Sequence, residues 1–246
     1  MTYCVGLKLD RGLAFMSDTR TNAGIDNVSV FQKMFKWDTP GERVLTLMTA
    51  GNLATTQSVV SLLNERALPA EERGAPSLLE APSMFQAAKL VGATLREVIQ
   101  TQTSAEGLES EGAFSATLIL GGQIKGAPPR LFLIYPEGNF VEAGDDTPFF
   151  QIGETKYGKP ILVRAYDSAM SFEDAVKLLM LSFDSTIKAN LSVGLPLDLQ
   201  LYETDSLQVG ANRRIEPGDV YFETLSSGWG EALKDAVQSM PPYELE

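Results

Sequence analysis

The chain lacks histidine altogether and has a single cysteine, Cys4, among its 246 residues. Without histidine, the Ser-His-Asp and Cys-His catalytic arrangements and histidine-based zinc sites are excluded, and we expect no metal site. One cysteine cannot form an intrachain disulfide, which suits a reducing cytosol. No run approaches the ~18 uncharged apolar residues of a membrane helix. Charged side chains interrupt the place where a signal peptide would have its apolar stretch, at Lys8, Asp10 and Arg11. We therefore expect a cytoplasmic protein with no membrane partner.

Positive charge is scarce as well. The chain has 20 Lys and Arg against 32 Asp and Glu, a net charge of −12, which argues against a nucleic-acid partner. No linker is long or polar enough to divide the chain, so we expect one domain over residues 1–246. Gly228-Trp229-Gly230 begins like a dinucleotide fingerprint, but Leu233 stands where the third glycine belongs. We therefore expect no cofactor.

The hydrophobic pattern predicts strands and helices in alternating groups. Strands are expected at residues 3–9, 13–17, 28–37, 44–49, 116–121, 131–135, 140–142, 199–203 and 220–225. Helices are expected at residues 53–67, 83–102, 157–165, 171–189 and 230–239. Asn52 is a good N-cap for the first helix, and a capping-box pattern at Ser171 opens the fourth. Groups of strands separated by helix pairs indicate a layered α+β domain rather than alternating βαβ units.

Thr2 attracts attention because it directly follows Met1. Methionine is removed readily when the next residue is small, so we expect a mature chain that begins with a free Thr2 amine beside the Thr2 hydroxyl. This pair combines a base and a nucleophile on one residue, which activates a threonine without imidazole. A Met-Thr start is common, however, and does not by itself indicate catalysis.

Three further features lie within the first 51 residues. Asp18 follows the second expected strand, Lys33 lies within the otherwise apolar third strand, and Gly51 closes the fourth. Each has a simpler explanation than catalysis. Asp18 would serve as a turn residue, Lys33 would point outward from an edge strand, and Gly51 would permit the turn into the next helix. Taken singly, these simpler explanations are favoured.

Together with Thr2, these features resemble the proteasome β-subunits, which are N-terminal-nucleophile hydrolases, and in particular their bacterial branch, called Anbu. The stretches that carry the resemblance are Thr2-Tyr3-Cys4-Val5-Gly6, Ala14-Phe15-Met16-Ser17-Asp18-Thr19-Arg20 with Ala23-Gly24, Gln32-Lys33, and Thr49-Ala50-Gly51. The resemblance implies a four-layer αββα sandwich. The expected order of strands and helices is compatible with that fold across nearly the whole chain.

The resemblance also implies roles for these residues. The Thr2 amine, with an unperturbed pKa near ~8, would take the proton of the Thr2 hydroxyl. A buried Lys33 ammonium would favour the alkoxide, with Asp18 as its counter-ion. The Gly51 N–H would donate a hydrogen bond to the oxyanion of the tetrahedral intermediate. The positions that resemble the substrate-binding pocket, and hint at small or apolar substrate side chains, are Thr21, Phe31 and Thr49.

The rest of the site departs from the family, which completes it with a serine and an Asp…Ser pair that hold the terminal amine. Glu154 stands where the first serine would fall. Asn190 replaces the expected acid, and Ser192 matches only if the register slips by one. Asparagine and serine still orient an amine by hydrogen bonds, but they perturb its pKa less than a carboxylate does. These departures favour weak activity or an unusual substrate.

The function implied is a threonine peptidase that cleaves peptides or proteins and forms a homo-oligomer, a ring or ring-like spiral of at least roughly six subunits. Apolar faces on the helices at 83–102 and 171–189 favour such contacts, although they would also suit the core of a monomer. These faces contain Phe85, Val91, Leu95, Leu179, Leu181 and Phe183. Three alternatives stay open: an amidase or acylase acting on a small amide, a weakly active assembly or binding protein that keeps the fold, and an unrelated α+β binding protein.

Overall fold

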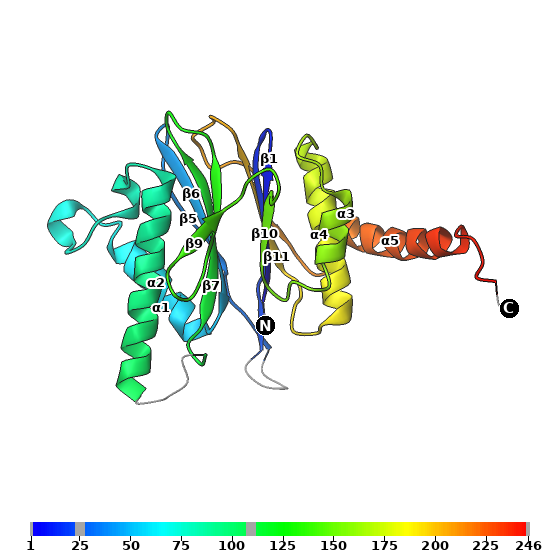
Figure 1. Ribbon diagram of the computed structural model, residues 1–246, viewed down its shortest axis with the longest axis horizontal. Coiled ribbons are helices and arrows are strands. Elements are labelled where there is room, and N and C mark those ends of the chain that lie inside the picture. The colour runs from blue at the N-terminus through cyan, green and yellow to red at the C-terminus, as the bar shows by residue number, and fades with distance from the viewer. Residues whose placement is uncertain (1, 23–27, 107–111, 245–246) are drawn as a thin grey trace.

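The computed structural model describes residues 2–22, 28–106 and 112–244. Two five-stranded β-sheets are stacked at its centre, and helices cover the outer face of each sheet (Figure 1). Both faces of each sheet are thereby buried, one against the other sheet and one against helices. This is a four-layer αββα sandwich, so the predicted fold class is confirmed.

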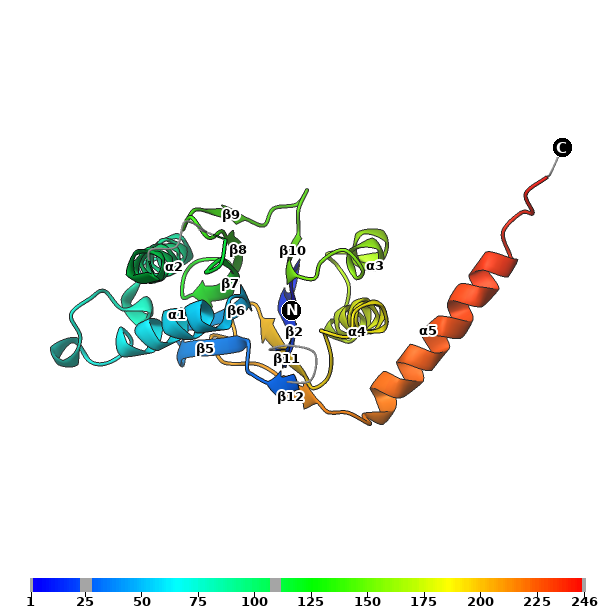
Figure 2. The ribbon, with the colours of Figure 1, turned by 90° about the horizontal axis from the view of Figure 1, so that it is seen from below.

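The first sheet carries the N-terminal part of the chain. Its strands are antiparallel, in the order β10-β1-β2-β11-β12. Their bounds are Phe149–Gly153, Tyr3–Leu9, Gly12–Asp18, Leu197–Glu203 and Asn212–Ile215. Its outer face is covered by α3 (Lys159–Ala165) and α4 (Phe172–Ala189) (Figure 2). β1 and β2 lie inside this sheet and are buried along almost their whole length.

The second sheet has the order β5-β6-β7-β8-β9, again antiparallel. Its strands are Met34–Thr39, Arg43–Gly51, Ala116–Ile124, Arg130–Ile134 and Phe140–Glu142. Its outer face is covered by α1 (Leu53–Glu65) and α2 (Met84–Glu106) (Figure 2). A separate two-stranded ladder pairs β3 (Arg20–Asn22) with β4 (Val28–Val30). α1 starts directly after β6 because the Asn52 side chain accepts the Thr55 N–H at 3.1 Å, as the sequence predicts.

Apolar side chains fill all three interfaces of the sandwich. Tyr3 and Phe183 belong to the core between the first sheet and its helices, whereas Phe15 belongs to the core between the sheets. A further cluster lies between the second sheet and α1 and α2. Close approach of the sheets depends on Gly121, where a Cβ would lie 2.6 Å from the Phe15 ring. The absence of a side chain there makes room for Phe15.

The strand expected at residues 28–37 is in fact two strands. β4 pairs with β3, whereas β5 pairs with β6 in the second sheet. Residues 31–33 between them belong to no strand. Lys33 is therefore not a strand residue, contrary to the sequence prediction. It lies in an irregular connection at the point where the chain changes its pairing partner.

The strand expected at residues 220–225 is wrong as well. This segment forms the first turns of α5 (Val220–Gln238), because the Asp219 side chain caps the helix by accepting the Phe222 N–H at 3.0 Å. The cap overrides the strand preference of Val220 and Tyr221. In addition, the sequence pattern does not predict β10 or β12.

α5 leaves the body of the molecule and extends away from it (Figure 2). Phe222 is its one buried residue, and residues 231–240 are all exposed. Within the described ranges, no helix combines the length and the apolar character needed to cross a membrane.

Candidate active site

Thr2 immediately precedes β1 and has 8% of its surface exposed. Its carbonyl oxygen accepts the N–H of Glu154 at 2.7 Å. Gly153, the last residue of β10, packs so closely that a Cβ there would overlap the Thr2 carbonyl oxygen. Gly153 also has a φ of +83°, which disfavours any side chain. The end of β10 therefore clamps the Thr2 backbone at a point where only glycine fits.

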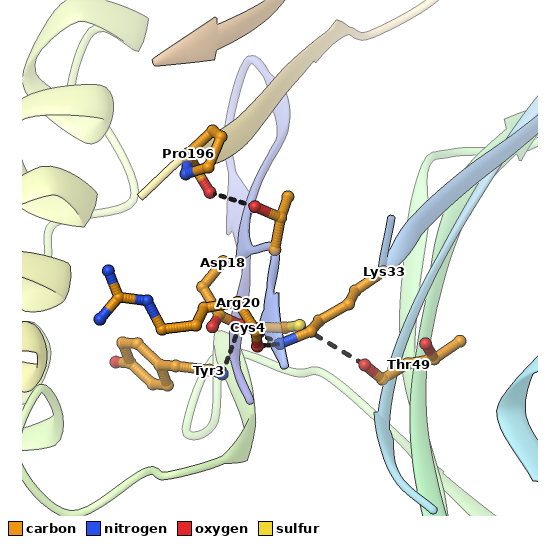
Figure 3. A network of polar contacts seen from close by, with 8 residues as sticks. Tyr3, Cys4, Asp18, Arg20, Lys33, Thr49 and Pro196 are labelled. Atoms are coloured by element: carbon orange, nitrogen blue, oxygen red, sulfur yellow. Dashed lines mark hydrogen bonds and ion pairs between the residues drawn. The ribbon is translucent and has the colours of Figure 1, made fainter. Parts of the chain in front are cut away.

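Lys33 extends from the side of the second sheet to Asp18, the last residue of β2 (Figure 3). Its Nζ donates to Asp18 Oδ1 at 2.8 Å and to the Arg20 carbonyl oxygen at 2.6 Å. Both side chains are buried, with Lys33 3% and Asp18 0% exposed. The same Oδ1 atom accepts the N–H of Tyr3 at 2.9 Å. Asp18 Oδ1 thus links the Lys33 ammonium to the backbone of Tyr3, the residue that follows Thr2.

The electrostatics of this pair follow from its burial. Burial raises the pKa of the Asp18 carboxyl above its usual range, and the Lys33 ammonium opposes that rise. The Lys33 backbone is fixed too, because its carbonyl oxygen accepts the Thr49 N–H at 2.9 Å. A fixed ammonium of this kind is suited to stabilising a negative oxygen that forms beside it.

The direction of the Gly51 N–H follows from the ladder around it. The Thr49 N–H bonds the Lys33 carbonyl on the β5 side, and the Asn52 N–H bonds the carbonyl that precedes β7. Successive N–H groups of a strand point to opposite sides, so the Gly51 N–H faces the β5 side. Pairing between β5 and β6 has already ended there. The Gly51 N–H therefore points past the end of β5.

Thr2, Lys33 and Gly51 line one cavity of about 510 Å³. Of the expected substrate-binding residues, Thr21 and Thr49 also line it. Phe31 is not among the described residues that do, which differs from the expectation. Its backbone N–H donates to the Thr19 carbonyl oxygen at 2.8 Å, beside the β3–β4 ladder.

The cavity wall includes residues that the sequence prediction missed. Gln32 lies in the same connection as Lys33 and Phe35 lies in β5, and α1 adds Leu53, Thr56 and Gln57. The α1 residues follow a helical spacing of three and four on the first turns after Gly51. That spacing is visible in the sequence, and with Gly51 assigned to the site it would have pointed to them.

The structure brings together the three residues that the sequence analysis placed near the terminal amine: Glu154, Asn190 and Ser192. Asn190 Nδ2 donates to Glu154 Oε2 at 2.8 Å, and Asn190 Oδ1 accepts the Ser192 N–H at 3.0 Å. This group adjoins Thr2 through the backbone of Glu154. Arg20 holds the connection after α4 in place, since its guanidinium donates to a backbone carbonyl there at 3.0 Å. Among the described residues, no cluster of three His, Cys, Asp or Glu side chains could hold a metal ion.

Comparison with known proteins agrees with this geometry. A family model of proteasome subunits matches residues 2–195. The chain is 48% identical to Anbu (ancestral β-subunit) from Yersinia bercovieri, with 99% of each chain covered and a TM-score of 0.90. It belongs to the Anbu family.

Other Anbu structures are similarly close. A Gly-1 mutant of Anbu from Hyphomicrobium sp. strain MC1 is 50% identical over the whole of both chains, with a TM-score of 0.91. The helical assembly of the Anbu complex from Pseudomonas aeruginosa contains a chain that is 46% identical, with 98% of each chain covered and a TM-score of 0.90. No curated protein matches the chain. Family membership removes the alternative of an unrelated α+β protein.

This Anbu chain is thus a proteasome-related protein with the N-terminal-nucleophile fold. Its cavity brings together a threonine hydroxyl, a buried ammonium and the last residue of β6, Gly51. These groups have the chemical character needed to add a hydroxyl to a carbonyl and to stabilise the resulting negative oxygen.

Proposed function

We propose that this Anbu chain is a threonine peptidase in which Thr2 is the nucleophile once Met1 has been removed. Met1 itself lies outside the described residues. The observation that carries the proposal is the Lys33 ammonium, buried 2.8 Å from Asp18 on the wall of the cavity that Thr2 lines. Burying a charged pair is costly even when its partners are well placed, and it adds little to stability. The pair is therefore best explained by its effect on Thr2.

The reaction proceeds through an ester on Thr2. The Thr2 amine accepts the hydroxyl proton as Oγ attacks the substrate carbonyl, and the Lys33 ammonium stabilises the developing alkoxide. The Gly51 N–H donates a hydrogen bond to the oxyanion, a contact worth about 3 kcal/mol. The intermediate then loses its C–N bond, and the leaving amine takes the proton held by the Thr2 amine. Water, deprotonated by the same amine, hydrolyses the ester and frees Oγ.

The group beside Thr2 modifies this reaction. The Glu154 side chain is largely buried, accepts the Asn190 amide and lies 3.6 Å from Lys156. We propose that Asn190 and Ser192 orient the free Thr2 amine by hydrogen bonds and that the negative charge of Glu154 favours its protonated form. A protonated amine cannot accept the hydroxyl proton. Glu154 therefore opposes the Lys33 ammonium, which favours the neutral amine, and it lowers activity at neutral pH relative to a chain without that carboxylate.

The substrate class follows from the cavity wall. Among the described residues that line the cavity, Lys33 alone carries a charge, and Phe35 and Leu53 are apolar. Such a wall accepts small or apolar side chains of a peptide or protein substrate. An amidase or acylase acting on a small amide would use the same chemistry. A substrate panel with peptides and small amides matched at the scissile bond separates the two.

The decisive experiment is the mass of the N-terminal peptide after exposure to an epoxyketone or a β-lactone. The wild-type chain is expected to lack Met1 and to carry one inhibitor on Thr2. Thr2→Ala and Lys33→Ala are expected to stay unmodified while remaining folded. Intact Met1 or an unmodified Thr2 in the wild-type protein would contradict the proposal and would favour a protein that serves in assembly or binding.

We also propose that the chain forms a homo-oligomer, a ring or ring-like spiral of at least roughly six subunits, like the helical assembly of its Pseudomonas aeruginosa relative. The helix faces expected to mediate it mostly serve the core of the subunit itself. Val91, Leu95, Leu179 and Phe183 are fully buried, although Phe85 is exposed.

α5 is better placed to make the contact between subunits. Its exposed apolar residues include Tyr221, Leu233 and Val237, and residues 231–240 are exposed throughout. A lone helix of this length is marginal in water, so packing on a neighbouring copy would stabilise it. Such contacts need no disulfide, which suits a cytoplasmic protein whose free cysteine is buried.

A further inference from the structure

The side chain of Tyr3 is fully buried and points away from Lys33 toward α4 (Figure 3). Its phenol oxygen lies 2.7 Å from Ser182 Oγ on α4 and accepts Gln151 Nε2 of β10 at 2.5 Å. Ser182 Oγ in turn lies 3.1 Å from the carbonyl oxygen of Gly158, which precedes α3. Residues from three separate segments of the chain therefore surround one phenol.

Only one arrangement of protons satisfies these contacts. A carbonyl oxygen only accepts, so Ser182 donates to Gly158, and an amide NH₂ only donates, so Gln151 donates to Tyr3. The Tyr3 hydroxyl is then left to donate to Ser182. Each group in this buried chain has its partner. Burial raises the pKa of the Tyr3 phenol to about 12, so it keeps its proton.

The chain packs tightly around this phenol. A Cβ at Gly158 would overlap both Ser182 Oγ and the Tyr3 hydroxyl. The Tyr3 ring also packs against Phe183, with ring centroids 4.5 Å apart. The ring therefore has little freedom to move relative to α4.

The backbone of Tyr3 is bonded on its other side to the catalytic ion pair. Its N–H donates to the Asp18 oxygen that also accepts Lys33 Nζ. Side chains of successive residues in an extended chain point to opposite faces. A Tyr3 ring held against α4 therefore directs the Thr2 side chain to the cavity, where Lys33 is.

We propose that Tyr3 is a positioning residue for the reaction, anchored by Ser182 and Gln151. The proposal rests on Thr2 being the nucleophile. Anchoring the phenol fixes residue 3, and residue 3 sets the distance between Thr2 Oγ and the Lys33 ammonium. Releasing the phenol lets Thr2 move relative to Lys33, and a displacement of about 1 Å can cost roughly 10²-fold in rate.

Tyr3→Phe tests this inference, with Tyr202→Phe as the matched control. Tyr202 is also fully buried, and its hydroxyl bonds Gln123 Oε1 at 2.6 Å. The readout is the rate at which an epoxyketone modifies Thr2, measured over a range of concentrations. We expect Tyr3→Phe to lower the maximal rate at least ~10-fold, with the half-saturating concentration within ~2-fold of wild type. Tyr202→Phe is expected to change neither the maximal rate nor the half-saturating concentration by more than ~2-fold. It should lower the melting temperature by an amount similar to that of Tyr3→Phe.

Ser182→Ala gives a second test that changes the fold less. It removes the acceptor of the Tyr3 proton and the donor to the Gly158 carbonyl but leaves the Gln151 bond to Tyr3, and it is expected to slow modification less than Tyr3→Phe. The double variant should be no slower than Tyr3→Phe alone, because both changes break the same contact. A wild-type maximal rate in Tyr3→Phe, or an equal slowing in Tyr202→Phe, would overturn the inference while leaving Thr2 as the nucleophile. Absence of modification in the wild-type chain would instead overturn the proposed function, and this inference with it.

Discussion

Replacing Lys33 by methionine removes the ammonium while keeping an unbranched, apolar side chain. The change leaves the fully buried carboxylate of Asp18 without its cation. Removing one partner of a buried ion pair costs about 3–5 kcal/mol, because the remaining charge is uncompensated. We therefore expect the free energy of unfolding of Lys33→Met to be lower than that of the wild type by about 3–5 kcal/mol near pH 7.

This deficit should depend on pH in a defined direction. Burial already raises the pKa of the Asp18 carboxyl in the wild type, where the Lys33 ammonium opposes the rise. In Lys33→Met that opposing charge is gone, so the pKa of Asp18 rises further. An acid whose pKa is higher in the folded than in the unfolded chain binds its proton more tightly when folded. Its contribution to stability is complete below the unfolded value of about 3.9 and is lost as pH rises through the folded value. The deficit of Lys33→Met should therefore be small near ~pH 4 and largest near ~pH 7.

Urea unfolding followed by circular dichroism, on variant and wild type at both pH values, measures this difference. Lys177→Met is the control, since Lys177 forms an ion pair with Asp174 at a similar 2.7 Å but both side chains are about half exposed. Lys177→Met should leave the free energy of unfolding nearly unchanged at either pH, because solvent screens this exposed pair. Adding Asp18→Asn to Lys33→Met should recover stability near neutral pH. An equal deficit at both pH values would refute an ionised Asp18–Lys33 pair.

Three further outcomes are expected. Gly153→Ala should reduce epoxyketone modification of Thr2 at least ~10-fold, because a Cβ there overlaps the Thr2 carbonyl; wild-type labelling would contradict the clamp. The pH–rate profile should rise with deprotonation of the Thr2 amine, at an apparent pKa below that of a free α-amine because of Lys33, and Glu154→Gln should shift it lower still. A profile flat from about pH 5 to 9 would exclude the amine as base. Val237→Asp on α5 should reduce the mass found by light scattering, whereas Lys234→Ala should not; an unchanged mass in both would remove α5 from the interface.

Three residues of the candidate site were visible in the sequence because they stand at strand ends that local patterns mark. Thr2 precedes β1, Asp18 ends β2 and Gly51 ends β6. Turn residues interrupt the apolar pattern at such points, so they are visible in the sequence. That these ends meet around one cavity is not a local property. The resemblance to a known family supplied that part of the prediction.

Lys33 marks the limit of local patterns. Residues 28–37 contain no glycine or proline, and nothing in them signals a break. The break arises because β4 pairs back with β3 and β5 pairs forward with β6, so the two halves of this apolar segment belong to different hairpins. In α5, by contrast, the signal is local, because the Asp219 cap could have been given more weight than the strand propensity that follows it.

Tyr3 shows why the core around the site matters for the proposed reaction. A nucleophile at the start of a chain is tethered by one peptide bond only, so its position must come from residue 3 and from contacts to its own backbone. Here those contacts are the Asp18 oxygen, the Glu154 N–H and the Ser182–Gln151 anchor of the Tyr3 phenol. To pattern analysis Tyr3 is simply a buried strand residue. Substitutions beneath the first sheet should therefore slow the reaction of Thr2 before they unfold the protein.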